Sequence, residues 1–199
     1  MLALAEDIMD ALLDCGASDV LLAGSLRRGV SAANDVDLVA VAPDPGVVAR
    51  AIMDGGTPIR PRITSRYFIA GQVGEARVDL WIAYPTQYGA ARLWATGPKG
   101  FNHALMLRAA DLGLRLNAFG VWSADGDLLA GGTESDVFSA LGVEQLDPAD
   151  RDAGSIRFTE PTTREPITDP ASRSILNDRR LLIRTDDGVK IRVNGEVER

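Results

Sequence analysis

The most constraining feature of this sequence is a set of aspartates inside two apolar runs. The runs read DVDLVAVA (residues 35–42) and ARVDLWIAY (residues 76–84). Alternate residues of a strand lie on the same face, so Asp35 and Asp37 point the same way. A neighbouring strand that carries Asp79 completes a cluster of three carboxylates. The pattern predicts a sheet that holds these side chains rigidly next to one another.

Such a cluster predicts a metal site, because three carboxylates repel one another strongly unless a cation neutralises them. The chain has one cysteine, Cys15, and one histidine, His103, so an internal disulfide and a cysteine metal cluster are both excluded. Oxygen ligands alone suit Mg²⁺ or Mn²⁺. Two such ions, about 3.5–4 Å apart, clamp the attacking and leaving oxygens of a phosphoryl displacement. We therefore expect two Mg²⁺ or Mn²⁺ ions at the three aspartates.

The stretch GSLRRG (residues 24–29) has the features of a phosphate cradle. Gly24 lets the backbone approach a phosphate, Ser25 can donate a hydrogen bond, and Arg28 can fork onto phosphate oxygens. Alternating aspartates alone are more typical of a half-exposed edge strand. Their combination with the Gly-Ser turn and a later isolated aspartate favours a catalytic site that holds a triphosphate.

Hydrophobic periodicity predicts an α+β fold in which a mixed sheet with helices on one face precedes a small helix-rich part. Helices are expected at 2–15, 45–56, 86–97, 100–113 and 133–142, and strands at 19–23, 35–42 and, as three short strands, within 59–84. Residues 114–131 predict two short strands around an Asp-Gly turn. A C-terminal β-hairpin is expected at 181–193, around another Asp-Gly pair.

The net charge and its distribution limit the functions that this chain can have. The formal net charge of −7 argues against a protein that coats nucleic acid. The basic excess lies in the middle of the chain, since residues 1–21 and 125–150 contain no Lys or Arg. The first helix carries several acidic side chains, which argues against a signal peptide or a membrane span. We expect a soluble, cytoplasmic protein that does not bind a membrane. The sequence does not indicate which proteins it binds.

Several segments together resemble a known family. After GSLRRG and DVDLV come RVDLWIAYPTQYGAARLWATGPKGFNHALMLRAADLGLRLNAFGVW and TESDVFSALGVEQLDPADRD. In this order they resemble the palm and nucleotide-binding subdomains of family X DNA polymerases, the group of DNA polymerase beta. The resemblance covers roughly residues 19–151. It implies a minimal form that lacks the amino-terminal lyase domain of the family.

The resemblance divides the chain into a nucleotidyltransferase palm (residues 1–92), a nucleotide-binding subdomain (93–151) and a tail (152–199) outside the family pattern. It implies that Asp35 and Asp37 bind both metals. Asp79 then binds the catalytic metal and helps to activate the primer 3′-hydroxyl, while Arg77 supports the carboxylates.

The same resemblance implies the nucleotide contacts. Ser25 and Arg28, beside Gly24, hold the β and γ phosphates. Trp94 and Gly97 belong to the tight turn WATG beside the incoming sugar, and Asn102 contacts the incoming base.

Among the positions that depart from the family pattern, two bear on substrate and template. Ala95 replaces an aromatic residue on the sugar side, which leaves the choice between dNTP and NTP open, and Met106 replaces an arginine that contacts the template strand.

The function that follows is transfer of dNMP from a dNTP to a DNA 3′-hydroxyl with release of pyrophosphate, in gap filling or end repair. The partners would be a dNTP and primer–template or gapped DNA. One alternative is a nucleotidyltransferase that adds NMP to RNA, a protein or a small molecule, which the acidic net charge favours. A second alternative, a catalytically silent DNA-binding module, is disfavoured because all three aspartates and the Gly-Ser pair are present.

Overall fold

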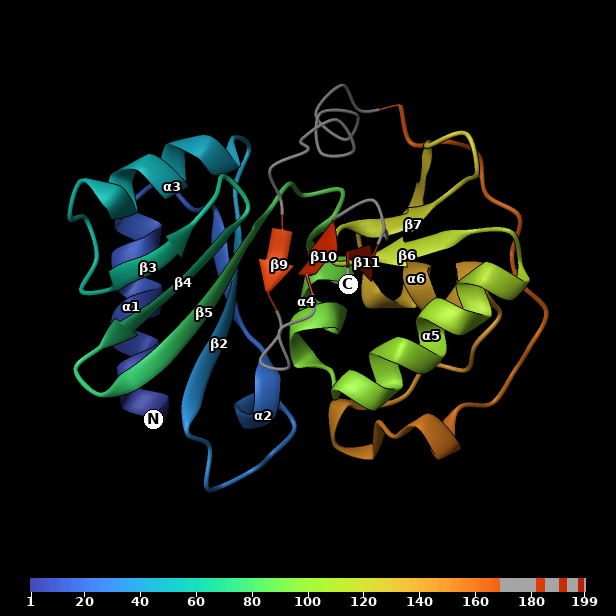
Figure 1. The fold of residues 1–199 in the computed structure, drawn as a ribbon, viewed down its shortest axis with the longest axis horizontal. Helices are drawn as coiled ribbons and strands as arrows, with labels where there is room; N and C mark the ends of the chain where they lie inside the picture. The colour runs from blue at the N-terminus through green and yellow to red at the C-terminus, as the bar shows by residue number, and fades with distance from the viewer. Residues whose placement is uncertain (169–181, 185–189, 193–196, 199) are drawn as a thin grey trace.

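The computed structural model describes residues 1–168, 182–184, 190–192 and 197–198 (Figure 1). Its elements form two neighbouring units, which we call the sheet unit (residues 2–83) and the helical unit (residues 88–141). Each has its own apolar core, and a third apolar cluster joins them. Within the described residues, no helix is both long and apolar enough to cross a membrane.

The sheet unit is built on five strands in the order β1-β2-β5-β4-β3. Its elements are α1 (Leu2–Asp14), β1 (Asp19–Leu22), α2 (Gly24–Arg27), β2 (Asp35–Val41), α3 (Pro45–Met53), β3 (Arg60–Thr64), β4 (Phe68–Val73) and β5 (Ala76–Ala83). Only β2 and β5 pair in parallel, and the other neighbours are antiparallel. The sheet is therefore mixed, and the predicted α+β class is confirmed.

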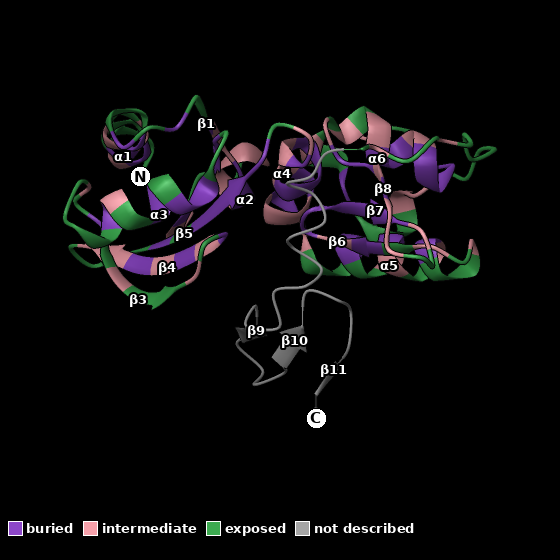
Figure 2. Cartoon of the chain, turned by 90° about the horizontal axis from the view of Figure 1, so that it is seen from above, coloured by how far each residue is buried: buried purple, intermediate pink, exposed green. Residues whose placement is uncertain are grey.

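Helices α1 and α3 cover one face of this sheet (Figure 2). The apolar faces of both helices pack on the alternate strand residues Val36, Leu38 and Ala40 of β2 and on their counterparts in β5. Because strand side chains alternate, the intervening residues of β2 and β5 must lie on the opposite face. That parity places the three aspartates away from the two helices.

The helical unit combines three helices with a small antiparallel sheet of order β6-β7-β8. Its elements are α4 (Tyr88–Thr96), α5 (Lys99–Asp111), β6 (Arg115–Asn117), β7 (Gly120–Trp122), β8 (Leu128–Ala130) and α6 (Glu134–Leu141). The predicted boundary between residues 92 and 93 falls inside α4. Thr133 and Asp136 form a capping box at the start of α6, and Gly142, in a left-handed conformation, ends the helix.

The sequence predicted two strands in residues 114–131, and this was wrong, because the segment forms three. A tight turn separates β6 from β7 inside a run that reads as one strand. Asn117 makes this turn, since its Oδ1 accepts hydrogen bonds from the backbone N–H of Phe119 at 2.8 Å and from Nε1 of Trp122 at 3.0 Å. A side chain that satisfies local donors in this way favours a turn over a continued strand.

The second face of the five-stranded sheet is half covered. At the carboxyl ends of β2 and β5, Val39, Trp81 and Ala83 pack on Ala91, Phe119 and other apolar residues of the helical unit. The aspartates lie in the amino-terminal halves of the same strands, where Asp35 and Asp37 are partly buried and Asp79 is exposed. One face therefore changes from an apolar interface to an acidic surface within a few residues.

After α6 the chain continues through two short 3-10 helices, η1 (Pro148–Asp150) and η2 (Ala153–Ser155). The tail then contains β9 (Leu182–Arg184), β10 (Lys190–Arg192) and β11 (Val197–Glu198) in one antiparallel sheet. Strands β9 and β10 pair with Ile183 opposite Ile191, within the predicted hairpin. The turn and the two ends of that hairpin lie outside the described residues.

Candidate active site

The backbone register places the three aspartates on one patch of the sheet. Asp37 lies directly opposite Asp79 across the parallel β2–β5 pair, and Asp35 lies opposite Arg77. Directly opposite residues of paired strands project from the same face. Asp35 and Asp37 are partly buried, whereas Asp79 is exposed. The sequence prediction that these side chains share one face therefore agrees with the strand register.

The electrostatics of this patch show an excess of negative charge. Burial raises the pKa of Asp37 to about 7, and repulsion by Asp35 and Asp79 adds to the rise, whereas Arg28 and Arg77 oppose it. Arg77 also lies 3.6 Å from a carboxylate oxygen of Asp35, in a pair that is open to solvent. The nearby arginines thus only partly offset the burial and repulsion that act on Asp37.

We tested whether these residues fit the divalent cations that the sequence predicts. In the part of the chain that the structure describes, no three His, Cys, Asp or Glu side chains converge into a ready-made metal cage. The donor set, however, consists of carboxylate oxygens from two adjacent strands. Burial, together with repulsion by Asp35 and Asp79, raises the pKa of Asp37 and so disfavours its ionised form, which a bound cation would stabilise. The residues therefore fit hard cations that bind with several water or phosphate ligands.

Gly24, in α2, packs against this carboxylate patch. It has a φ of +61°, and a Cβ atom built on it would lie 1.8 Å from Oδ2 of Asp37. A side chain at this position is excluded by the backbone conformation and by direct overlap with the carboxylate. The backbone of the Gly-Ser turn therefore lies against the central aspartate.

The two polar side chains of the Gly-Ser stretch differ in their contacts. The Oγ atom of Ser25 is buried and has no hydrogen-bond partner. Nη1 of Arg28 donates to the carbonyl oxygen of Thr96, and Arg28 also acts electrostatically on Asp37. A buried hydroxyl without a partner is uncommon and points to a missing acceptor. Arg28 connects the carboxylate patch to the end of α4.

The remaining predicted nucleotide contacts gather at the end of α4. A Cβ atom on Gly97, whose φ is +62°, would lie 3.8 Å from Nη1 of Arg28 and 4.0 Å from Nδ2 of Asn102. Asn102 is buried, and its Nδ2 donates to the carbonyl oxygen of Trp94 at 2.8 Å, while its Oδ1 has no partner. Trp94 itself is half-buried in the cluster between the two units. The structure thus brings Arg28, Gly97 and Asn102 together around one turn.

Sequence reasoning missed a buried ionic group next to this turn. Nη1 and Nη2 of Arg27 donate to the two carboxylate oxygens of Glu134 at 2.5 and 2.8 Å, and Nη1 also donates to Oγ1 of Thr96 at 2.8 Å. Arg151 donates to the same two carboxylate oxygens at 3.3 and 2.9 Å. No local signal reveals this group, because Arg27 and Glu134 are separated by more than a hundred residues.

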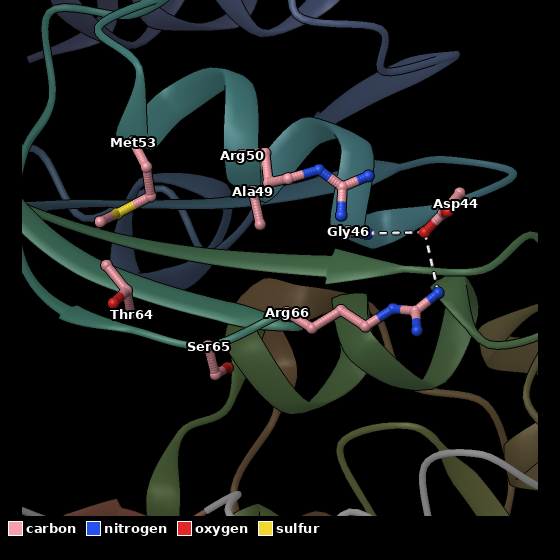
Figure 3. Close-up of a pocket in the computed structure, with 8 residues that line it drawn as sticks. All are labelled: Asp44, Gly46, Ala49, Arg50, Met53, Thr64, Ser65 and Arg66. Carbon is pink, nitrogen blue, oxygen red and sulfur yellow. Dashed lines mark hydrogen bonds and ion pairs between the residues drawn. The ribbon is translucent and has the colours of Figure 1, made fainter.

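A separate cavity of about 310 Å³ lies at the other end of β2 (Figure 3). Arg66 points across it towards Asp44 and donates at 2.8 Å to Oδ1 of Asp44 and at 2.9 Å to the hydroxyl of Tyr84. Four residues of β2 (38–41) follow Asp37 before the chain reaches this cavity, which corresponds to about 13 Å of strand. It is therefore distinct from the carboxylate patch, and Arg66 holds the turn between β3 and β4 against α3.

The mixed five-stranded sheet followed by a small three-stranded antiparallel sheet is compatible with a polymerase beta-like fold. Residues 91–152 match the family model of the DNA polymerase beta thumb. The match spans most of the helical unit and ends just after Arg151, and it supports a relationship to family X polymerases. No curated protein matches the chain significantly.

Proposed function

We propose that this chain is a metal-dependent nucleotidyltransferase that adds dNMP from a dNTP to a DNA 3′-hydroxyl and releases pyrophosphate. The observation that carries the proposal is the pairing of Asp37 with Asp79 across two parallel strands, with the backbone of Gly24 packed against Asp37. This arrangement joins a hard-cation ligand set to a turn that a phosphate can approach.

Each residue then has a defined task. Asp35, Asp37 and Asp79 would hold Mg²⁺ or Mn²⁺, which in such sites stabilises negative charge on phosphate oxygens and lowers the pKa of the attacking hydroxyl. Ser25 would give its unpartnered hydroxyl to a phosphate oxygen. Arg28 would exchange the carbonyl of Thr96 for phosphate oxygens, which are stronger acceptors for a guanidinium group.

The end of α4 would receive the rest of the nucleotide. The Cβ position of Gly97 lies within 4 Å of both Arg28 and Asn102, and Asn102 keeps an unpartnered Oδ1 there. The thumb match over residues 91–152 supports DNA as the acceptor. Gap filling or end repair would be the cellular use of such an activity.

The acidic net charge of −7 favours a second candidate, transfer of NMP to RNA, a protein or a small molecule. An acidic surface repels the DNA backbone, so DNA binding would have to rest on the basic middle of the chain. Both candidates use the same carboxylates and differ only in the acceptor.

The deciding experiment is an extension assay on gapped, primer–template and blunt DNA, with each dNTP and NTP and with Mg²⁺ or Mn²⁺. Parallel reactions offer RNA 3′ ends and the protein itself as acceptors. We expect extension of gapped or primed DNA. Labelling of RNA or protein without DNA extension would favour the second candidate, and transfer to no acceptor would overturn the proposal.

A further inference from the structure

Glu134 accepts hydrogen bonds from two arginines, and it lies where the two units meet. It is the first residue of α6, and its side chain is only 12% exposed. Arg27 reaches it from α2 of the sheet unit, and Arg151 reaches it from beyond η1. The two guanidinium groups donate four hydrogen bonds to its two oxygens, so the position of the carboxylate is fixed from both sides.

Arg151 anchors this group within the helical unit. Its side chain is fully buried, and its guanidinium lies over the rings of Phe101 and Phe138 at 5.8 and 5.6 Å from their centroids. Its Nε also donates to the carbonyl oxygen of Leu146 at 3.3 Å. Aromatic faces and a carbonyl oxygen are favourable surroundings for a buried guanidinium. Arg151 therefore gives Glu134 a rigid support.

Arg27 transmits this support to the nucleotide turn. The same Nη1 atom that donates to Glu134 donates to the hydroxyl of Thr96, which is fully buried at the end of α4. Arg28, the next residue, donates to the carbonyl oxygen of Thr96. Two consecutive arginines of α2 thus hold Thr96 by its hydroxyl and by its carbonyl, directly before Gly97.

The choice of Arg27 matters for this connection. A planar guanidinium can serve two carboxylate oxygens and a hydroxyl at once, whereas an ammonium group is a single point charge on a flexible stem. A buried ion pair of this kind is often no more stabilising than apolar packing of the same volume. The Arg27–Glu134 pair also holds Thr96 through Arg27, which apolar side chains of the same volume would not do.

We infer that Glu134 is a positioning residue for nucleotide binding: it orients Arg27, which fixes Thr96 and the following turn where Arg28, Gly97 and Asn102 converge. This inference rests on the proposed function, since it concerns the same nucleotide site. Glu134 itself contacts none of the residues predicted to bind the nucleotide, and it affects the site only through Arg27.

Two variants test the connection from its two ends. Glu134→Gln removes the charge that orients Arg27, and Thr96→Val removes only the hydroxyl and leaves both ion pairs intact. Arg164→Gln is the matched control, because Arg164 pairs with Asp136 on the same helix at 2.9 Å but makes no contact with Arg27 or Thr96. Each full-length protein is assayed for dNTP affinity with Mg²⁺, for KM and kcat in extension, and for hydrogen exchange of residues 94–98.

We expect Glu134→Gln and Thr96→Val to weaken dNTP affinity and to raise KM by about tenfold, the effect of losing one hydrogen bond to a charged group. kcat should change much less, and exchange at residues 94–98 should rise. The double variant should lose no more affinity than the stronger single variant, because both changes break one connection. Arg164→Gln should behave like the wild type.

Wild-type dNTP affinity and KM in Thr96→Val would overturn the inference, whatever Glu134→Gln does. If Glu134→Gln does not fold, Thr96→Val decides alone. Faster exchange with unchanged affinity would also overturn it, because Glu134 would then be merely structural. Failure of the proposed function has a different signature: the wild-type protein transfers to no acceptor, while dNTP affinity and exchange still report on the turn.

Discussion

The molecule contains two carboxylate centres with opposite electrostatics. At the ends of β2 and β5, three aspartates share one face, and burial together with mutual repulsion raises the pKa of Asp37 to about 7. At the start of α6, Glu134 lies between Arg27 and Arg151. Burial raises the pKa of Glu134, but hydrogen bonds from the two arginines outweigh it, so the pKa lies below its ordinary value.

The difference distinguishes a centre whose charge the protein compensates from one whose charge a ligand would have to compensate. Glu134 has all of its charge compensated by the protein, so its arrangement serves the structure and positions its neighbours. At Asp37, burial and repulsion outweigh the two nearby arginines, and the nearby Ser25 hydroxyl has no partner. Groups left in this condition cluster at functional sites, because a ligand supplies what the protein does not. The two centres should therefore respond differently to mutation and to pH.

The largest effect is expected at the undercompensated centre. Asp79→Asn should lower the transfer rate by about a thousandfold or more, because several kcal/mol of transition-state stabilisation depend on this carboxylate. dNTP affinity should change little, since Asp35 and Asp37 remain. Turnover and dNTP affinity are measured together, with Asp10→Asn on the exposed side of α1 as the control. Near-normal turnover in Asp79→Asn would show that the assignment of Asp79 is wrong.

The compensated centre should instead respond in stability. Glu134→Gln should lower the free energy of unfolding by about 3–5 kcal/mol, because it leaves two guanidinium groups without their carboxylate. Arg164→Gln breaks a partly exposed pair on the same helix and should cost about 0–1 kcal/mol. Urea unfolding at neutral pH measures both. Equal losses in the two variants would remove the distinction between the centres.

The contributions of the two centres to stability should change with pH in opposite directions. A raised folded-state pKa means that ionised Asp37 destabilises the fold, so its unfavourable contribution grows from about pH 4 to about pH 7 and is constant above. Asp37→Asn should therefore be more stable than the wild type at pH 8, by at most about 4 kcal/mol, and the difference should shrink towards pH 4. Thermal unfolding without divalent ions measures this.

For Glu134 the pH dependence has the opposite sign. Because its pKa is lower in the folded state, the ionised carboxylate stabilises the fold above the unfolded-state pKa. This stabilisation is lost as the pH falls through the folded-state pKa. The stability deficit of Glu134→Gln should therefore be largest near neutral pH and should shrink in acid. An Asp37→Asn advantage that is the same at pH 5 and pH 8 would contradict the raised pKa of Asp37.

The smallest effect concerns the close approach of Gly24 to Asp37. Gly24 and Gly74 have nearly equal φ angles, +61° and +60°, but a Cβ on Gly74 would meet nothing within 4 Å. Gly74→Ala should thus report the backbone strain alone, about 1–2 kcal/mol. Gly24→Ala should cost about 1–3 kcal/mol more, because of overlap with Asp37. If the two variants lose equal stability by urea unfolding, the backbone of Gly24 does not contact the carboxylate.

The sequence by itself determined the strands that carry the aspartates and the face on which they lie. The period-2 alternation in residues 35–38 and 77–80 favours one arrangement, because a shift by one residue would bury the carboxylates against α1 and α3. The capping box of Thr133 was equally readable, since its hydrogen bonds are local. The turn at Asn117 was missed, because its side chain acts on donors that the pattern does not show.

Tertiary structure alone decided the rest of the site. The pairing of β2 with β5 brings Asp37 opposite Asp79, and the packing of the helical unit on Val39 and Trp81 buries one half of that face and leaves the acidic half open. The connection from Glu134 through Arg27 to Thr96 joins three elements that are distant in the chain. Alternation and capping depend on neighbours within a few residues and so appear in the sequence. Charge compensation depends on which elements meet, which only the packed fold determines.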